Sequence, residues 1–313
     1  MANYNTNTTA TGTLSPTIQT YYEKQLLANA KPILVHNQFG QKKQIPKGSG
    51  KKINFRKFSK LAKATTALTE GVTPDGNSMT ITEVEATVKQ YGAYITTSDM
   101  LELSAIDPVV AENNKILSMN AAETLDYLTA QILAAGTNVI YAGGGTSRAA
   151  LTAESNKLTV SDVKKAAAIL KNNCASKIDG AYVAIVHPFV GFDLMNDPEW
   201  IDVKTYDNKD LYAGEIGTLY GIRFVESSEA TVFKDAGASA ADVFATLVIG
   251  ADAYGVTEIS GGGLKMIVKQ LGSGGSTDPL DQRGTQGWKA SHAAVILNQL
   301  NMVRIESAAT MTL

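Results

Sequence analysis

The segment from Asp107 to Ala135 constrains the fold more than any other part of the chain. Aspartate followed by proline is a common helix start, because Asp accepts hydrogen bonds from free backbone N–H groups and Pro fits the first turn. Gly136 ends the pattern, and apolar side chains recur before it every three to four residues, at Val109, Leu117, Ala121, Leu125, Leu128 and Ile132. About 28 helical residues span roughly 42 Å, which predicts a long spine and not a helix inside a compact globule.

Residues 46–95 have the pattern of two long strands joined by a turn. Side chains alternate over Lys52–Phe58 and again over Thr80–Ile95, and Thr73–Asn77 is a strong turn signal between them. A single hairpin buries too little apolar surface to be stable alone in water. We therefore expect this two-stranded excursion to lie against something else, and a second copy of the chain is the natural candidate.

The charge is unevenly distributed along the chain. Between Glu23 and Glu70 there are eleven basic residues and no acidic one, while the remainder holds 17 basic and 30 acidic residues. A basic arm beside an acidic body predicts contacts with a neighbouring copy or with nucleic acid. The alternative is a solvated lysine-rich edge that prevents aggregation. The candidate contact residues are Lys42, Lys43, Lys47, Lys51, Lys52, Arg56, Lys57, Lys60 and Lys63.

Elsewhere the patterns of apolar residues alternate irregularly between helix and strand. This irregular order favours an α+β fold over a doubly wound sheet. Helices are expected from Pro16 to about Leu34, over Ser161–Asn173 and from Pro188 to about Asn196. Strands are expected at Ala181–Val186, Ile222–Glu226, Phe244–Ile249, Leu264–Lys269 and, as the final strand, Ala293–Glu306.

Composition excludes several classes of protein. One cysteine, Cys174, allows no disulfide framework, and we expect its side chain to be buried filler. The Asn/Thr-rich start lacks the features of a signal peptide, and the apolar runs are too short to span a bilayer, so a soluble protein is expected. His36, His187 and His292 are far apart and lack ligand partners at helical spacing, so we expect structural roles and no metal site.

Catalytic motifs are missing from the glycine-rich segments. The run Gly143–Arg148 lacks the Lys that a phosphate-binding loop requires, and no Gly-x-Ser-x-Gly motif is present. Asp278 and Asp281 could form a carboxylate pair for hydrolysis, but they are too close in sequence for the opposed carboxylates of a glycosidase. The interpretation we prefer is a rigid loop in which Asp281 or Asp278 pairs with Arg283 and Trp288 anchors the start of the final strand.

Four segments carry a family resemblance. Asp278-Pro279-Leu280-Asp281-Gln282-Arg283-Gly284, with Gly287-Trp288-Lys289 and Ala293–Asn298, resembles the C-terminal signature of major capsid proteins of tailed bacteriophages. Further segments of that family are similar to Gly214–Ser227, to Thr69-Glu70-Gly71 followed by Pro74, and to the stretch from Tyr91-Gly92 to Asp99. The resemblance covers about residues 15–307 and is greatest for the branch related to the coat protein of the coliphage N-four.

The resemblance implies an α+β, tailed-phage major capsid protein fold. Its expected parts are an N-terminal arm (1–45), an extended β-loop (46–95), a peripheral domain with the spine helix (96–158), an axial domain (159–277) and a return to the peripheral domain (278–313). It also implies a structural protein without enzymatic activity or cofactor that self-assembles into pentamers and hexamers of an icosahedral shell.

The implied shell encloses double-stranded DNA in the virion and is assembled in the host bacterial cytoplasm. Portal and scaffolding or decoration proteins are the further expected partners, and no membrane is involved. Two alternatives stay open from the sequence. One is an encapsulin-like bacterial compartment shell, and the other is a hydrolase that uses Asp278 or Asp281.

Overall fold

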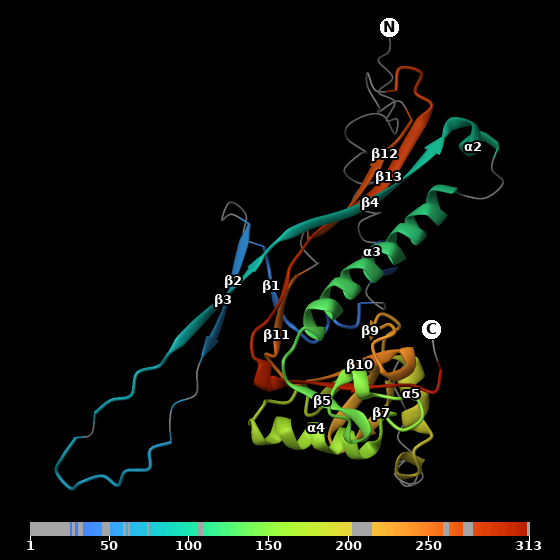
Figure 1. Ribbon diagram of the computed structural model, residues 1–313. Helices are drawn as coiled ribbons and strands as arrows, with labels where there is room; N and C mark the ends of the chain where they lie inside the picture. Colours follow the sequence, from blue (N-terminus) through green and yellow to red (C-terminus); the bar gives the residue numbers. More distant parts are fainter. Residues whose placement is uncertain are drawn as a thin grey trace.

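The computed structural model describes residues 26, 29–30, 34–45, 51–58, 61, 63–73, 75–104, 109–201, 215–258, 263–271 and 278–311. Three parts are visible in Figure 1: a body of sheet and helices, a long helix that leads away from it beside a narrow sheet, and a hairpin whose loop projects to the side. No helix of the described residues has the length and apolar content needed to cross a membrane.

The body is built on a mixed sheet of seven strands. Their order is β5 (Val139–Tyr141), β15 (Met302–Ser307), β10 (Val243–Ile249), β6 (Tyr182–Val186), β8 (Ile222–Glu226) and β7 (Glu215–Leu219), and β9 (Val232–Phe233) also pairs with β10. Helices α4 (Val160–Asn172) and α5 (Pro188–Met195) complete this part, together with the short 3-10 turns η1 (Ala142–Gly144), η2 (Arg148–Ala150) and η3 (Ala238–Ala240).

Both faces of this sheet are buried, which explains its nearly continuous apolar strands. Successive side chains of a strand point to opposite faces. Ala184 and Val248 belong to the core shared with α4 and α5. Ile185 and Leu247 belong to a second core on the other face, which includes Leu133 at the end of the long helix.

The long helix α3 (Val109–Ala134) covers one face of a separate, three-stranded antiparallel sheet. The strand order is β12 (Leu264–Lys269), β13 (Arg283–His292) and β4 (Lys89–Ser98), and α2 (Asp99–Ser104) follows β4. Leu117 and Leu125 of α3 pack against Met266 and Trp288 of the sheet. At 1.5 Å per residue the 26 residues of α3 extend about 39 Å. The predicted long helix is therefore confirmed from Val109 onward. Asp107 and Pro108, its predicted start, lie outside the described residues.

The remaining strands join the body to the projecting hairpin. A three-stranded sheet has the order β1 (Gln41–Lys43), β11 (Tyr254–Thr257) and β14 (Ala294–Ile296). The hairpin itself is the antiparallel pair β2 (Lys52–Phe58) and β3 (Ile81–Thr87). Most other predicted elements are confirmed to within a residue or so at each end. They are the strands at 181–186, 222–226, 244–249 and 264–269 and the helices at 161–173 and 188–196. Of the predicted helix at 16–34, only residues 26, 29 and 30 are described as helical.

Two strand predictions were wrong. The predicted strand Thr80–Ile95 is divided at Val88, whose N–H donates to the Lys51 carbonyl, and the second part, β4, pairs along its whole length with β13. The predicted final strand Ala293–Glu306 is divided into β14 and β15 by the 3-10 turn η5 (Gln299–Asn301). The side chain of Asn298 accepts a hydrogen bond from Leu300 N and caps that turn. Trp288 therefore lies inside β13 and does not start the final strand.

Cys174 is exposed, so its predicted burial was wrong. It follows the C-terminus of α4 with a positive φ of 51°. Its N–H donates to Lys171, and Ala175 N donates to Leu170 O. This pattern closes the helix as a Schellman motif, whose left-handed residue sits at the surface.

Candidate functional site

The β2–β3 hairpin is docked on its own chain by one apolar face. Ile53 and Phe55 are buried in a cluster with Ala293 and Leu297, beside β14. A Cβ placed on Gly255 of β11 would lie 2.5 Å from the ring of Phe55, so the missing side chain at this position lets the ring settle on the backbone. The base of the hairpin is therefore packed against β11 and the residues beside β14.

The opposite face of the hairpin carries charges that already have partners in the chain. Lys52 Nζ lies 2.6 Å from Glu85 Oε2, and Arg56 Nε lies 3.6 Å from Glu83 Oε1, with all four side chains exposed. The hydrogen bond and charge of Glu85 raise the pKa of Lys52. Exposed pairs of this kind add little stability. They do leave Lys52 and Arg56 less available to a neighbouring molecule than the sequence suggests.

The other predicted contact residues divide into three groups. Lys57 Nζ donates to Asn298 Oδ1 at 3.0 Å, and Lys43 Nζ donates to the Asn54 carbonyl, so both brace the hairpin against the chain. Lys42, Lys51 and Lys63 are exposed. Lys47 and Lys60 lie outside the described residues. Contacts of these residues with another copy or with DNA stay a prediction.

Beyond the hairpin, the described residues between Leu61 and Thr80 form neither helix nor strand. Large apolar side chains are nevertheless exposed there, among them Leu68 at 76% of its free surface. Leu61, Val72 and Met79 are exposed in the same segment, and Phe58 and Ile81 are exposed at the adjoining ends of β2 and β3. Several large apolar side chains exposed on one projecting segment make it a candidate interaction surface. Sequence reasoning missed the residues between Leu61 and Thr80 because they have no helical or strand period, although apolar residues in a stretch rich in Thr, Gly and Asn were a usable signal.

The C-terminal loop is held by Asp278. Its Oδ2 accepts the backbone N–H of Arg283 at 2.8 Å, and its Oδ1 lies 3.8 Å from Arg283 Nε. Asp281 is exposed and has a φ of 55°. Asp278, and not Asp281, is thus the partner of Arg283, and the two carboxylates do not share a site. No group of three or more His, Cys, Asp or Glu in the described residues is arranged to hold a metal ion.

The three histidines have the structural roles that the sequence predicted. His36 Nδ1 lies 2.7 Å from Asp126 Oδ2 in α3, and both side chains are fully buried. His187 caps α5 by accepting from Phe189 N. His292 Nε2 lies 3.0 Å from Thr129 Oγ1, and burial lowers the pKa of His292 to about 4. The contacts of His36 and His292 fasten the chain before the hairpin and the end of β13 to the spine helix.

A buried ionic cluster joins the far end of the spine to the body. Arg304 of β15 donates from Nη1 to the carbonyls of Ala134 and Gly136, which satisfies the C-terminal end of α3. Glu306, which is fully buried, accepts from Arg304 and from Arg148 at 2.6–2.8 Å. Spine and body therefore meet through fixed contacts, which suits a subunit whose surfaces must keep their relative positions.

The chain matches a family model described as phage capsid protein over residues 81–305, more than two thirds of its length. A comparison with curated protein sequences finds no match. Among solved structures, the capsid of Ralstonia phage GP4 has a TM-score of 0.73 at 15% identity, with 89% of each chain covered. The capsid of cyanophage Pam1 has a TM-score of 0.68 at 14% identity, with 91% of this chain and 93% of that chain covered.

The capsid of cyanophage P-SCSP1u has a TM-score of 0.66 at 17% identity, with 88% of each chain covered. At such identities the likeness shows the fold, and the predicted α+β, tailed-phage capsid fold is confirmed. The narrower prediction of a branch related to the coliphage N-four stays a prediction. The family match and the shared fold agree, and this chain belongs to the phage capsid protein family.

Proposed function

We propose that the chain is the major capsid protein of a tailed bacteriophage and that many copies assemble into an icosahedral shell. The observation that carries this proposal is the projecting hairpin and its loop, in a chain that belongs to the phage capsid family. Large apolar side chains on such a loop are exposed to water, and the free energy falls when another molecule covers them. A second copy of the same chain is the partner that a shell provides.

The role is mechanical and needs no catalytic group or cofactor. Contacts between different surfaces of identical subunits close into rings when the rotation between neighbours allows it. In the proposed shell, rings of five and six form in this way. The body, to which most of residues 159–277 belong, forms the axial domain near the ring centre. The spine and the narrow sheet, including β12 (Leu264–Lys269), form the periphery.

The proposed shell encloses double-stranded DNA. Any contact of the lysines at 42–63 with that DNA is expected to be independent of sequence and weakened by salt. Portal and scaffolding or decoration proteins are the further proposed partners, and assembly is proposed to take place in the bacterial cytoplasm. An encapsulin-like compartment shell is less well supported, because the matched family is that of phage capsid proteins.

The test is assembly of the purified full-length chain. Sedimentation velocity and negative-stain microscopy should show rings or closed particles. In a shortened variant, a four-residue Gly/Ser turn joins Phe58 to Ile81, which face each other in the hairpin register. This variant should stay folded by circular dichroism but should assemble poorly. The proposal would be refuted if the wild-type chain stays monomeric at every salt and protein concentration and the shortened variant behaves identically.

A further inference from the structure

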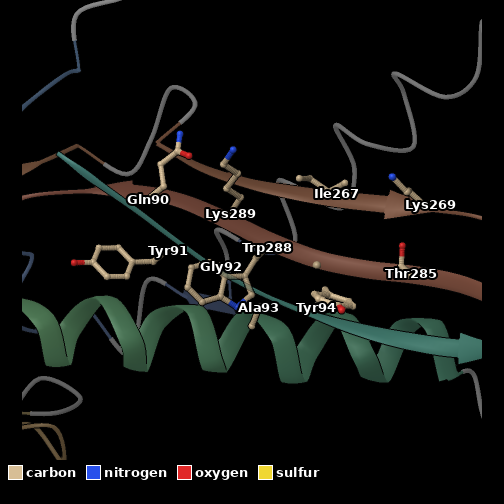
Figure 2. A pocket seen from close by; sticks show the side chains of 11 residues that line it. Gln90, Tyr91, Gly92, Ala93, Tyr94, Ile267, Lys269, Thr285, Trp288 and Lys289 are labelled. Atoms are coloured by element: carbon tan, nitrogen blue, oxygen red, sulfur yellow. The ribbon is translucent and has the colours of Figure 1, made fainter. Parts of the chain in front are cut away.

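The spine helix α3 has a second apolar face, which is exposed to water. Leu117 on its first face packs against the narrow sheet, and Figure 2 shows Trp288 of that sheet lying between the strands and the helix. Ile116, Met119 and Tyr127 also belong to α3, but they are 55%, 43% and 49% exposed. Large apolar side chains exposed together on one element mark a candidate contact surface.

These side chains form a stripe along the helix. Successive residues of an α-helix are rotated by about 100° and rise by about 1.5 Å. Residues 112, 116, 119, 123 and 127 therefore fall within an arc of roughly 80° and extend over about 22 Å. They are Glu112, Ile116, Met119, Glu123 and Tyr127, and all five are exposed. We call this set the outer stripe of α3.

The charges of the outer stripe have no ion-pair partner within the described part of the chain. None of the ion pairs between described residues involves Glu112, Glu123 or Lys115, which is exposed at the edge of the stripe. Glu123 also stands near another carboxylate, because burial and the negative charges of Glu123 and Asp126 raise the pKa of Glu229 in the body. A cation supplied by another molecule would relieve this repulsion, so the stripe is suited to a partner that brings a lysine.

The outer stripe is complementary to itself when two copies are antiparallel. Lys115 is four residues before Met119, and Glu123 is four residues after it. If a two-fold axis passes close to Met119, Lys115 of each copy therefore stands opposite Glu123 of the other. Glu112 and Tyr127 lie seven and eight residues from Met119, so the Tyr127 hydroxyl comes within reach of the Glu112 carboxylate of the second copy. An isologous contact requires such reciprocal pairing of two groups across the axis.

We propose that two copies of the chain contact each other through the outer stripe, antiparallel about a two-fold axis close to Met119. Ile116 of each copy packs against Met119 of the other, and two Lys115–Glu123 pairs flank this apolar centre. The inference rests on the proposed shell and names a contact that joins its rings. Heterologous contacts close each ring, whereas two subunits of adjacent rings meet across a two-fold axis.

The proposed contact is small. It covers three large apolar side chains from each copy, whereas a stable interface has roughly 20–30 residues from each partner. Exposed ion pairs also add little. We therefore expect the free chain to form only a weak dimer. In the shell the contact persists because many weak contacts act together there.

A single cysteine on the axis tests the geometry. Only an isologous contact brings one residue next to its own copy, so Met119→Cys in a Cys174→Ser background should form a disulfide-linked dimer when diamide is added to particles. No larger species should appear, because each chain then carries one thiol. Gln131→Cys in the same background is the matched control. Gln131 is exposed on the same helix, about 18 Å from Met119, and its variant should give at least about fivefold less dimer.

Charge exchange tests the pairing. Lys115→Glu and Glu123→Lys should each raise the protein concentration needed for assembly by about fivefold at low salt, because like charges then face each other on both sides of the axis. The double variant restores opposite charges and should assemble like wild type. Glu154→Lys, which reverses another exposed charge, is the control and should assemble normally. Urea unfolding should show that Glu123→Lys does not destabilise the subunit, because the substitution removes a negative charge near Glu229.

The outcomes separate this inference from the proposed function. If wild-type particles form but Met119→Cys gives no more dimer than Gln131→Cys, or the single charge variants assemble like wild type, only this inference fails. If the double variant assembles as poorly as the single ones, the stripe binds a different molecule and the inference fails as well. If the wild-type chain forms no particles, the proposed function fails. The dimer yield of the concentrated, free Met119→Cys variant relative to Gln131→Cys then decides the inference.

Discussion

Replacing Trp288 with alanine tests how the narrow sheet is fixed to the spine. The indole is 4% exposed and packs with Leu117, Ala121 and Leu125 of α3. Its Nε1 donates to Asn120 Oδ1 at 3.0 Å. Loss of this contact would loosen the narrow sheet on the spine helix. In the proposed shell it would affect assembly as well as folding.

The expected loss can be worked from the buried surface. A buried aromatic side chain removes roughly 150–250 Å² from water, which at about 25 cal/mol per Å² corresponds to about 4–6 kcal/mol. A compact unfolded state lowers this value by roughly 10–40%, which leaves about 3–5 kcal/mol, the usual cost of Trp→Ala in a core. The lost hydrogen bond adds at most about 1 kcal/mol, because Asn120 is exposed and water can replace the indole.

Urea unfolding of the unassembled subunit is the assay for this substitution. Trp288→Ala should lower the free energy of unfolding by about 3–5 kcal/mol and reduce the yield of particles. Trp288→Phe keeps most of the apolar contact and should cost about 1–2 kcal/mol, while Asn120→Ala should cost about 1 kcal/mol or less. A Trp288→Ala subunit within about 1 kcal/mol of wild type, forming particles normally, would refute the reasoning.

Three further predictions concern buried groups. Glu306→Ala leaves the buried guanidinium of Arg304 without its carboxylate and should lower the free energy of unfolding in urea by about 3–5 kcal/mol. A loss below about 1 kcal/mol would show that the buried ion pair does not hold spine and body together. Burial lowers the pKa of His292 from 6.5 to about 4, so the unfolded chain binds the proton first. Stability should therefore be complete above pH ~6.5 and fall by about 3 kcal/mol as the pH drops toward ~4, and His292→Gln should flatten this part of the profile. Gly255→Ala should clash with Phe55, cost about 1–3 kcal/mol and increase proteolysis within residues 51–88, and unchanged proteolysis would show that the hairpin is held in another way.

Local sequence patterns predicted an element correctly where its own residues, and not a distant partner strand, determine its structure. The apolar period of residues 109–134 predicted the spine because burial of one face repeats with the helical turn. The alternation of Lys52–Phe58 predicted β2 and its buried face. The histidines could be predicted to be structural because metal ligands have characteristic spacing, although their partners, Asp126 and Thr129, could not be named.

The errors arose where two segments far apart in sequence decide the outcome. The strand pattern of 80–95 continues through Val88, but pairing changes there from β2 to β13, and periodicity carries no record of the partner strand. The final strand is divided because Asn298 caps a turn, and alternation alone did not reveal this. Cys174 was expected to be buried, because residue type gives an average burial and not the geometry of a particular helix end.

The sequence by itself determined the spine helix, the hairpin, most of the body strands and the contrast between a basic arm and an acidic body. These features depend on spacing and charge along the chain. Only the tertiary structure decided that Lys52 and Arg56 are paired within the hairpin, that Asp278 pairs with Arg283, and that Lys265 and Lys289 stand opposite each other on the narrow sheet. The physical reason is that pairing between distant strands, and the side chains it brings together, follows from packing of the whole chain.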